Sequence, residues 1–389
     1  MSPLYLLIPL LPLAAWSGWY LARRGRLSDG DRVNELSSSY FRGLNYLLNE
    51  QPDKAIEVFL ELAELNRDTV ETHLALGNLF RRRGEVERAI RVHQHLVARP
   101  NLNDPMKTIA LLELGEDYMR AGLLDRAETL FSDLVAMGAH APSALRHLIA
   151  IYQHERDWHK AIEHARKLES MSGEPEAETI AHYYCELAEQ SRQHGAINET
   201  RDYMKHAFAS HPDSVRAHLL DGHLLVAEGR LADAALAYER ACNCDVEFVP
   251  EILPYLLETY AGLGQDARAE AFLRELLDRY QGISPVLALH RLIKRRDGED
   301  AAVAFLTAQL RQRPSVRGLT TLIEATASRA GAAERNNFLI LRDLTHKLME
   351  GQAMYRCSRC GFGAKAHHWQ CPSCKSWGSV RPIRGVANE

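Results

Sequence analysis

The sequence predicts an all-α protein in which a stack of paired helices follows an apolar N-terminal segment and ends in a small metal-binding ribbon. Three observations support this fold class. Small and aromatic residues recur in the body of the chain with a period of 34 residues, interrupted by a four-residue insertion before the third copy. A stretch of 19 residues near the start carries no charge, and four of the seven cysteines lie within the last 33 residues. Each observation defines one part of the chain.

The composition is that of an ordinary globular protein. The chain has 389 residues, of which 46% are hydrophobic and 25% charged, so it is long enough for more than one domain. Its 47 Lys and Arg against 51 Asp and Glu give a net charge of −4. A balance of this kind provides no overall attraction to nucleic acid or to anionic lipid, and we expect no nucleic-acid partner.

The N-terminal segment, residues 1–22, is predicted to be a transmembrane anchor. Residues 4–22 carry no charge, and at about 1.5 Å per residue they nearly match a hydrocarbon core of roughly 30 Å. Arg23, Arg24 and Arg26 follow the segment, whereas no Lys or Arg precedes it, which is opposite to a signal peptide. Positive flanks stay in the cytoplasm. We therefore expect a single pass with the N-terminus outside the cell's cytoplasm, a linker over 23–35 and a cytoplasmic body.

The role of this segment beyond anchoring stays open. Pro9 and Pro12 lie within it and are expected to kink it, and membrane helices tolerate such kinks where neighbours satisfy the freed carbonyls. A passive tether and an element that binds a membrane partner are both compatible with this sequence.

The body of the chain, residues 36–315, is predicted to contain about eight two-helix repeats. The same spacing of small and aromatic residues joins Gly43, Tyr46, Ala55 and Phe59; Gly77, Phe80, Ala89 and His93; and Gly115, Tyr118, Ala127 and Phe131. Small residues let the helices of a pair approach closely, and we expect the aromatic residues to fill the gap between neighbouring pairs. Residues 316–353 keep helical apolar spacing without this signature and are predicted to cap the array.

The period resembles the tetratricopeptide repeat. Stacked repeats of this kind coil into a superhelix whose concave face holds an extended segment or a helix of another protein. The sequence therefore predicts a binding surface in the body, and the repeat residues themselves are interpreted as its core.

The C-terminal part, residues 354–389, is predicted to be a metal ribbon. Two Cys-x-x-Cys pairs, separated by ten residues, supply its ligands: Cys357, Cys360, Cys371 and Cys374. Each pair places two thiolates on one ion in a tetrahedral set, and so short a segment needs the metal for most of its folding energy. Zinc is favoured, although four thiolates also bind iron. Gly361 supplies the permissive backbone after the first pair, and Lys375 holds the equivalent place after the second.

Other residues of metal-binding type are interpreted as structural. His367 and His368 could be ligands, but four cysteines already complete a closed site, so solvated or packed histidines are favoured. Cys185, Cys242 and Cys244 lie in helical repeats with no histidine cluster beside them, and free cysteine is often simply buried.

Catalysis is not expected of this chain. His154, Glu155 and His159 approach a zinc-protease motif, but their histidines are five residues apart rather than four. The sequence contains neither a phosphate-binding loop nor a serine nucleophile motif. We therefore predict that the chain is not an enzyme.

The whole chain resembles the lipopolysaccharide assembly protein B family. The resemblance rests on the uncharged segment followed by Gly-Trp-Tyr and Arg-Arg, on the repeats GLNYLLNEQPDKAIEVFLEL and GNLFRRRGEVERAIRVHQ, and on the tail YRCSRCGFGAKAHHWQCPSCKSWGSVRPIRG. It implies a rubredoxin-like ribbon with Cys357, Cys360, Cys371 and Cys374 as ligands.

The resemblance also implies a function. Members of the family are inner-membrane proteins that regulate lipopolysaccharide biosynthesis by helping the membrane protease FtsH to degrade the deacetylase LpxC. The implied partners are FtsH, LpxC and a membrane regulator that senses lipopolysaccharide. We also consider other lipopolysaccharide assembly proteins and further copies of the chain as partners.

Two alternatives from other classes remain at this stage. The basic residues around the cysteines would suit a zinc-ribbon protein that binds nucleic acid, and its binding would weaken steeply with salt. Rubredoxin-like cysteine pairs would also suit electron transfer, which needs redox-active iron. Neither alternative explains a long repeat array tied to a membrane.

Overall fold

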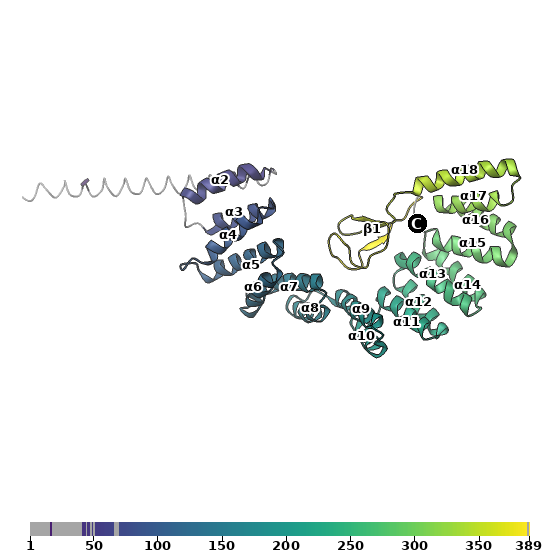
Figure 1. The fold of residues 1–389 in the computed structure, drawn as a ribbon, viewed down its shortest axis with the longest axis horizontal. Helices are drawn as coiled ribbons and strands as arrows, with labels where there is room; N and C mark the ends of the chain where they lie inside the picture. The colour runs from purple at the N-terminus through teal and green to yellow at the C-terminus, as the bar shows by residue number, and fades with distance from the viewer. Residues whose placement is uncertain are drawn as a thin grey trace, which may run out of the picture. The chain divides into compact units, whose positions relative to one another are not determined.

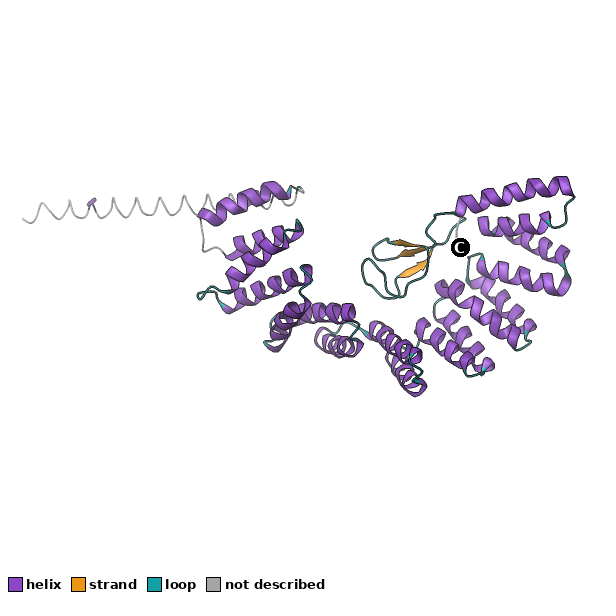
Figure 2. Ribbon diagram, in the orientation of Figure 1, coloured by secondary structure: helices purple, strands orange, loops and turns teal. Residues whose placement is uncertain are grey.

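The computed structural model of the chain describes residues 16–17, 41–43, 45–46, 49, 51–65, 70–386 and 389. The chain divides into two compact units, Met1–Gly173 and Glu174–Glu389. Helices make up most of both units, and the strands described lie near the C-terminus (Figures 1 and 2).

The first unit is built from helices that pack in sequence order. They are α2 (Pro52–Leu65), α3 (Val70–Arg82), α4 (Val86–Val97), α5 (Asp104–Arg120), α6 (Leu124–Ala136), α7 (Ala141–Glu155) and α8 (Trp158–Ser172). The turn within a pair is tight: Gly84 and Gly122 adopt φ of +81° and +75° between paired helices. Glycine enters this left-handed region without the steric cost that a side chain brings.

The second unit continues the same arrangement and then changes to a small sheet. Its helices are α9 (Ala177–Gln193), α10 (Ile197–Ser210), α11 (Val215–Ala227), α12 (Leu231–Cys244), the short η2 (Val246–Phe248), α13 (Val249–Gly262), α14 (Asp266–Arg279), α15 (Ser284–Asp297), α16 (Glu299–Gln312), α17 (Val316–Ala327) and α18 (Ala332–Met349). The pair α17 and α18 lies within the segment expected to cap the array.

The recurring small residues lie where the two helices of a pair touch. A Cβ atom added to Gly115 of α5 would lie 2.6 Å from the ring of Phe131 in α6, and one added to Gly222 would lie 2.3 Å from the Tyr238 ring. The aromatic residues thus pack within a pair as well as between pairs, since Phe131 also stacks on His147 of the next repeat at a centroid distance of 4.7 Å. Phe131 therefore fills the gap between pairs, as expected, and also packs against the small residue within its own pair.

One repeat carries a polar group at the aromatic position. His93 of α4 is fully buried against Gly77, and its Nδ1 lies 2.5 Å from Oδ2 of the buried Asp117. Arg81 donates from Nη1 to the other oxygen of Asp117 at 2.8 Å. A buried carboxylate is tolerated because both of its oxygens have partners.

The C-terminal ribbon is a three-stranded antiparallel sheet. Its strands are β1 (Tyr355–Cys357), β2 (Gly363–Ala364) and β3 (Val380–Pro382), in the order β2-β1-β3. Tyr355 pairs with Ala364 on one side and with Pro382 on the other. The central strand therefore ends at the first cysteine of the site.

The predicted membrane anchor falls almost wholly outside the described residues. Of residues 1–22 only Trp16 and Ser17 are described, and the linker over 23–35 lies outside as well. Among the helices that the structure does describe, none combines the length and the apolar character that crossing a membrane requires.

Candidate metal centre and repeat groove

The two cysteine pairs form matching turns. The N–H of Gly361 donates to the carbonyl of Cys357 at 3.0 Å, and the N–H of Lys375 donates to the carbonyl of Cys371 at 2.9 Å. Gly361 adopts φ of +78° and Lys375 of +59°. Both turns thus need a left-handed residue one position after the second cysteine, and the second turn places a side chain where glycine would be unstrained.

The four thiols come together in one cluster. All four sulfur atoms lie within 4.8 Å of one another, with Cys357 Sγ 3.7 Å from Cys374 Sγ and Cys360 Sγ 3.7 Å from Cys371 Sγ. A tetrahedral ion with metal–sulfur bonds of about 2.3 Å needs sulfurs roughly 3.8 Å apart. The geometry fits one metal ion held by one thiolate from each cysteine.

Local hydrogen bonds favour the thiolate form of one cysteine in this cluster. Burial opposes ionisation of Cys357, but the Ser379 hydroxyl and the backbone N–H groups of Cys360 and Arg359 outweigh it and lower the pKa of Cys357 to about 6. Burial raises the pKa of Cys371 to about 11. A bound divalent ion would supply the positive charge that keeps all four thiolates deprotonated.

The other residues of metal-binding type lie elsewhere. His367 packs edge-on against Trp369 at a centroid distance of 4.6 Å, and His368 is exposed. Cys185 and Cys242 are fully buried among helices, where burial raises the pKa of each thiol. Within the described residues, the four cysteines of the ribbon are the group whose ligand atoms meet at one point.

Two tryptophans attach the ribbon to the repeats of the second unit. Trp377 stacks on His182 of α9 at a centroid distance of 5.1 Å and meets the edge of Tyr183 at 5.9 Å. Trp369 stacks on Phe248 at 5.3 Å. Aromatic pairs in these geometries are worth about 0.5–1.5 kcal/mol each beyond their buried area.

A buried arginine lies between the two tryptophans and the helices. The Arg216 guanidinium carbon is 5.7 Å from the Trp377 ring centre and 5.9 Å from the Trp369 ring centre. Its side chain is 4% exposed, and Nη2 donates to Glu186 at 2.8 Å and to Glu189 at 3.2 Å. Paired carboxylates and ring faces together compensate the charge that burial would otherwise leave unsolvated.

Polar contacts extend the attachment along the ribbon. The Tyr355 hydroxyl donates to Glu251 of α13, and Arg384 pairs with Glu247. Arg381 pairs with Asp245 at 3.0 Å. The positive charge of Arg381 and Arg384, which had suggested nucleic-acid binding, therefore faces carboxylates of the repeat array.

The docking residues were not singled out from the sequence. His182 and Arg216 lie in repeats whose signature is weak, and their ribbon partners are more than 150 residues away along the chain. One signal was present: a ribbon this small cannot bury both Trp369 and Trp377 within itself. Two large aromatic residues beside a metal site indicate a surface that packs on something larger.

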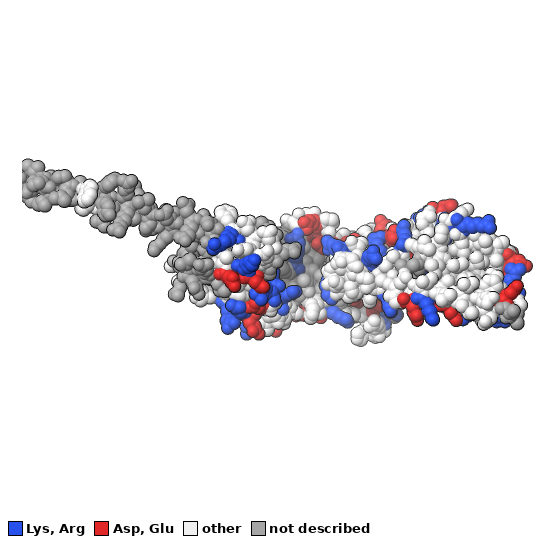
Figure 3. Space-filling view, turned by 90° about the horizontal axis from the view of Figure 1, so that it is seen from above, with Lys and Arg blue, Asp and Glu red and all other residues white. Residues whose placement is uncertain are grey.

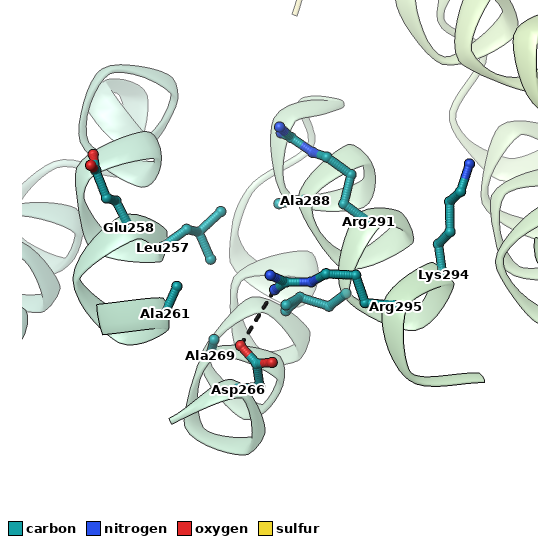
Figure 4. Close-up of a pocket in the computed structure, with 10 residues that line it drawn as sticks. Leu257, Glu258, Ala261, Asp266, Ala269, Ala288, Arg291, Lys294 and Arg295 are labelled. Atoms are coloured by element: carbon teal, nitrogen blue, oxygen red, sulfur yellow. Dashed lines mark hydrogen bonds and ion pairs between the residues drawn. The ribbon is translucent and has the colours of Figure 1, made fainter. Parts of the chain in front are cut away.

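The repeats of the second unit also form a groove of about 570 Å³ between α13, α14 and α15 (Figure 4). Leu257 and Ala261 line one side and Ala288 and Leu292 the other. Arg291 rises from α15 at the rim, where the structure gives it one long hydrogen bond, 3.4 Å to a backbone carbonyl of its own helix. The groove thus joins an apolar floor to a guanidinium that has no carboxylate partner within the described residues.

The other cations that line this groove are already paired, and Glu258 adds a carboxylate on the α13 side. Arg295 contacts Asp266 at 3.4 Å, as the dashed line in Figure 4 marks. Lys294 lies 2.6 Å from Glu299. Arg291 is accordingly the cation of this groove that is best placed to meet a carboxylate from outside.

Fold and site together define a class: helical-repeat proteins of the tetratricopeptide type that carry a four-cysteine, rubredoxin-like module. Family models agree, because a rubredoxin metal binding domain matches residues 355–382 and tetratricopeptide repeats match 72–106, 112–174 and 198–245.

Relatives place the chain more narrowly. It is 38% identical over 385 residues to lipopolysaccharide assembly protein B of Escherichia coli strain K12, covering 98% of this chain and 99% of the relative. It is 34% identical over 391 residues to the protein of the same name from Haemophilus influenzae, covering 97% and 98%. The chain belongs to the lipopolysaccharide assembly protein B family.

Proposed function

We propose that this chain is an inner-membrane adaptor that regulates lipopolysaccharide biosynthesis by promoting FtsH-dependent proteolysis of the deacetylase LpxC. The observation that carries the proposal is the identity of 38% along 98% of the chain to a lipopolysaccharide assembly protein. The roles of protease and deacetylase follow from what the family resemblance implies.

The apolar segment, residues 4–22, gives the adaptor its position. A chain tied to the membrane beside a membrane protease converts capture of a soluble substrate into delivery at that surface. Tethering of this kind raises the effective concentration of the substrate without any new chemistry. The adaptor therefore needs binding surfaces and an anchor, and it needs no catalytic group of its own.

The groove between α13 and α15 supplies one binding surface. Its apolar floor suits an aliphatic side chain, and Arg291 suits a carboxylate on the same segment. A bound segment with both features would gain apolar burial and a charge-assisted hydrogen bond together. We assign this groove to a segment of the deacetylase or of the protease.

The metal ribbon gives the adaptor a second, rigid surface. Its docking through Trp369 and Trp377 fixes the ribbon on the repeats, so both surfaces keep a constant separation within the second unit. The bound ion would act as a structural crosslink, and its removal would loosen this surface without touching the helices.

Crosslinking followed by co-purification from membranes tests the proposal. The wild-type chain should recover both the protease and the deacetylase. Arg291→Glu should reduce the recovery of one of them by about tenfold, since a rim guanidinium that pairs with a carboxylate is worth about 1.4 kcal/mol when partly desolvated. Arg240→Glu is the matched control, because Arg240 is exposed on α12.

The outcome that contradicts the proposal is also direct. If neither protein is recovered with the wild-type chain under conditions that retain it in membranes, the chain is not their adaptor. If both proteins are recovered and Arg291→Glu behaves as Arg240→Glu does, the adaptor role stands and the assignment of the groove fails.

A further inference from the structure

The outer face of α18, the last helix of the array, is apolar. Ile340, Leu341, Leu344 and Leu348 are between 47% and 64% exposed. Spacings of three and four residues place Leu341, Leu344 and Leu348 in one stripe along the helix. Figure 3 shows a broad area with few charged side chains at the end of the molecule where α18 lies.

A contact with α17 fixes the orientation of α18. Thr345 is buried, and its hydroxyl lies 2.9 Å from that of Thr320 in α17. This contact turns one side of α18 inward and leaves the leucine stripe facing outward. Terminal repeats of a solenoid ordinarily present a polar outer face for solubility, so an apolar outer face at this position indicates an interface.

The charges beside the stripe would match those of a second, antiparallel copy of the same helix. Asp343 and Lys347 lie four residues apart on one edge of the stripe. Asp343 is 60% exposed and pairs with the adjacent Arg342, whereas Lys347 is exposed with no ion-pair partner within the described residues. A second helix of the same sequence in the opposite direction would offer its own Lys347 to Asp343.

We propose that this face binds a second copy of the chain, with the two α18 helices antiparallel about a two-fold axis beside Leu344. In this arrangement Leu344 meets Leu344 of the second copy, and Leu341 meets its Leu348. Asp343 meets its Lys347, and symmetry repeats each contact. One helix thus supplies the apolar seam and both members of the flanking ion pair.

The charge pattern favours a second copy over a lipid surface. Helices that lie on anionic membranes carry Lys and Arg along the edges of their apolar face. Here the edge carries one acid and one base, which an anionic surface would partly repel and a two-fold partner would fully match.

Charge reversal in the full chain, purified in detergent, tests the proposal. The dissociation constant of the dimer is measured by sedimentation. Asp343→Lys and Lys347→Asp should each weaken the dimer by about tenfold or more, because each places like charges together at two symmetric positions. The double variant Asp343→Lys with Lys347→Asp restores opposite charges and should recover the wild-type constant.

Disulfide trapping checks the register. Leu344→Cys should form a covalent dimer under mild oxidation. The two-fold axis would bring the two Cα atoms at this position to the roughly 5–6 Å separation that a disulfide needs. Leu236→Cys is the matched control, since Leu236 is also an exposed leucine, 42% accessible, but lies on α12. Helical content and metal content show that each variant is folded.

Several results would overturn this inference. A chain that stays monomeric at every concentration has no such interface. A dimer that tolerates Asp343→Lys, or one that the double variant fails to restore, uses another surface. A stripe that instead binds anionic vesicles as a monomer, with Leu344→Arg abolishing that binding, belongs to the membrane.

Discussion

Trp377 of the metal ribbon stacks on His182 of helix α9, with ring centroids 5.1 Å apart and planes inclined by 22°. This contact joins the four-cysteine ribbon to the repeat array. The neighbouring Arg216 faces the same tryptophan and is held by two carboxylates of the array. The ribbon is therefore docked on the repeats of the second unit.

Removal of Trp377 should loosen the ribbon. We expect Trp377→Ala to lower the free energy of docking by about 2 kcal/mol, because a half-buried indole loses its area and its aromatic contacts. Hydrogen exchange should quicken in β1 and β3. Trp377→Phe keeps a ring against His182 and should retain most of the protection. Equal exchange in wild type and Trp377→Ala would contradict the docking described here.

Acid should destabilise the folded chain through His182. Burial, followed by the charges of Arg216, His211 and His367, lowers the pKa of His182 to about 3, against about 6.5 in an unfolded chain. The unfolded state therefore binds the extra proton first. The stability contributed by neutral His182 is present above pH 6.5 and is lost as the pH falls toward 3.

The size of this effect can be measured by urea unfolding. Between pH 7.5 and 5.5 the histidine should account for about 1.4 kcal/mol of lost stability. His182→Phe keeps the stacking on Trp377 and should lose correspondingly less over the same interval. Both proteins must retain their metal at the lower pH, and elemental analysis is the control for this. Parallel pH dependences of the two proteins would refute the assignment.

Chelation should unfold the ribbon and spare the helices. We expect four thiolates around one ion to provide most of the folding energy of residues 355–382, while the helical pairs have their own apolar core. We expect one metal per chain, with zinc the predicted ion, and its removal should abolish amide protection in the sheet with little change in helical circular dichroism. Cys371→Ser should behave like the chelated protein. A ribbon that keeps its protection without metal would show that the cysteines are not its main support.

Replacing Gly115 with alanine should destabilise the folded chain, whereas the same replacement at Gly262 should not. The Cβ of Gly115→Ala would lie 2.6 Å from the Phe131 ring, which cannot move freely in the core. The Cβ of Gly262→Ala would meet only the flexible end of Leu231, at 3.2 Å. Alanine favours a helix by up to about 1 kcal/mol over glycine, and overpacking costs about 1–3 kcal/mol.

These two glycines make a matched pair for thermal unfolding of the full chain. Gly262→Ala should be neutral or stabilising and Gly115→Ala destabilising, with about 2 kcal/mol between them. The reverse order would mean that the spacing of small and aromatic residues does not reflect the packing of a pair.

Local patterns predicted most of what the structure shows. The helix pairs follow from a spacing that one pair contains within itself, as between Gly115 and Phe131, and the cysteine cluster follows from two short turns. Even the left-handed residue after each pair was visible as Gly361 and Lys375. Such features are encoded within a few tens of residues.

Contacts between distant segments were not predictable in this way. His182 and Trp377 are separated by most of the second unit, and no local rule joins a histidine in a weak repeat to an indole in a ribbon. The contact between His93 and Asp117 was not predictable either. A histidine at an aromatic position of the repeat indicates a buried polar contact, but not which residue makes it. The anchor, residues 4–22, rests on sequence alone.

The half-life of the deacetylase after depletion of this chain tests the central claim most directly. Protein synthesis is blocked, and the deacetylase is followed by immunoblot in cells that contain or lack the chain. The account predicts that the deacetylase persists several-fold longer without the chain, and that the full chain restores its turnover whereas a chain without residues 4–22 does not. A half-life that is the same with and without the chain would contradict the account.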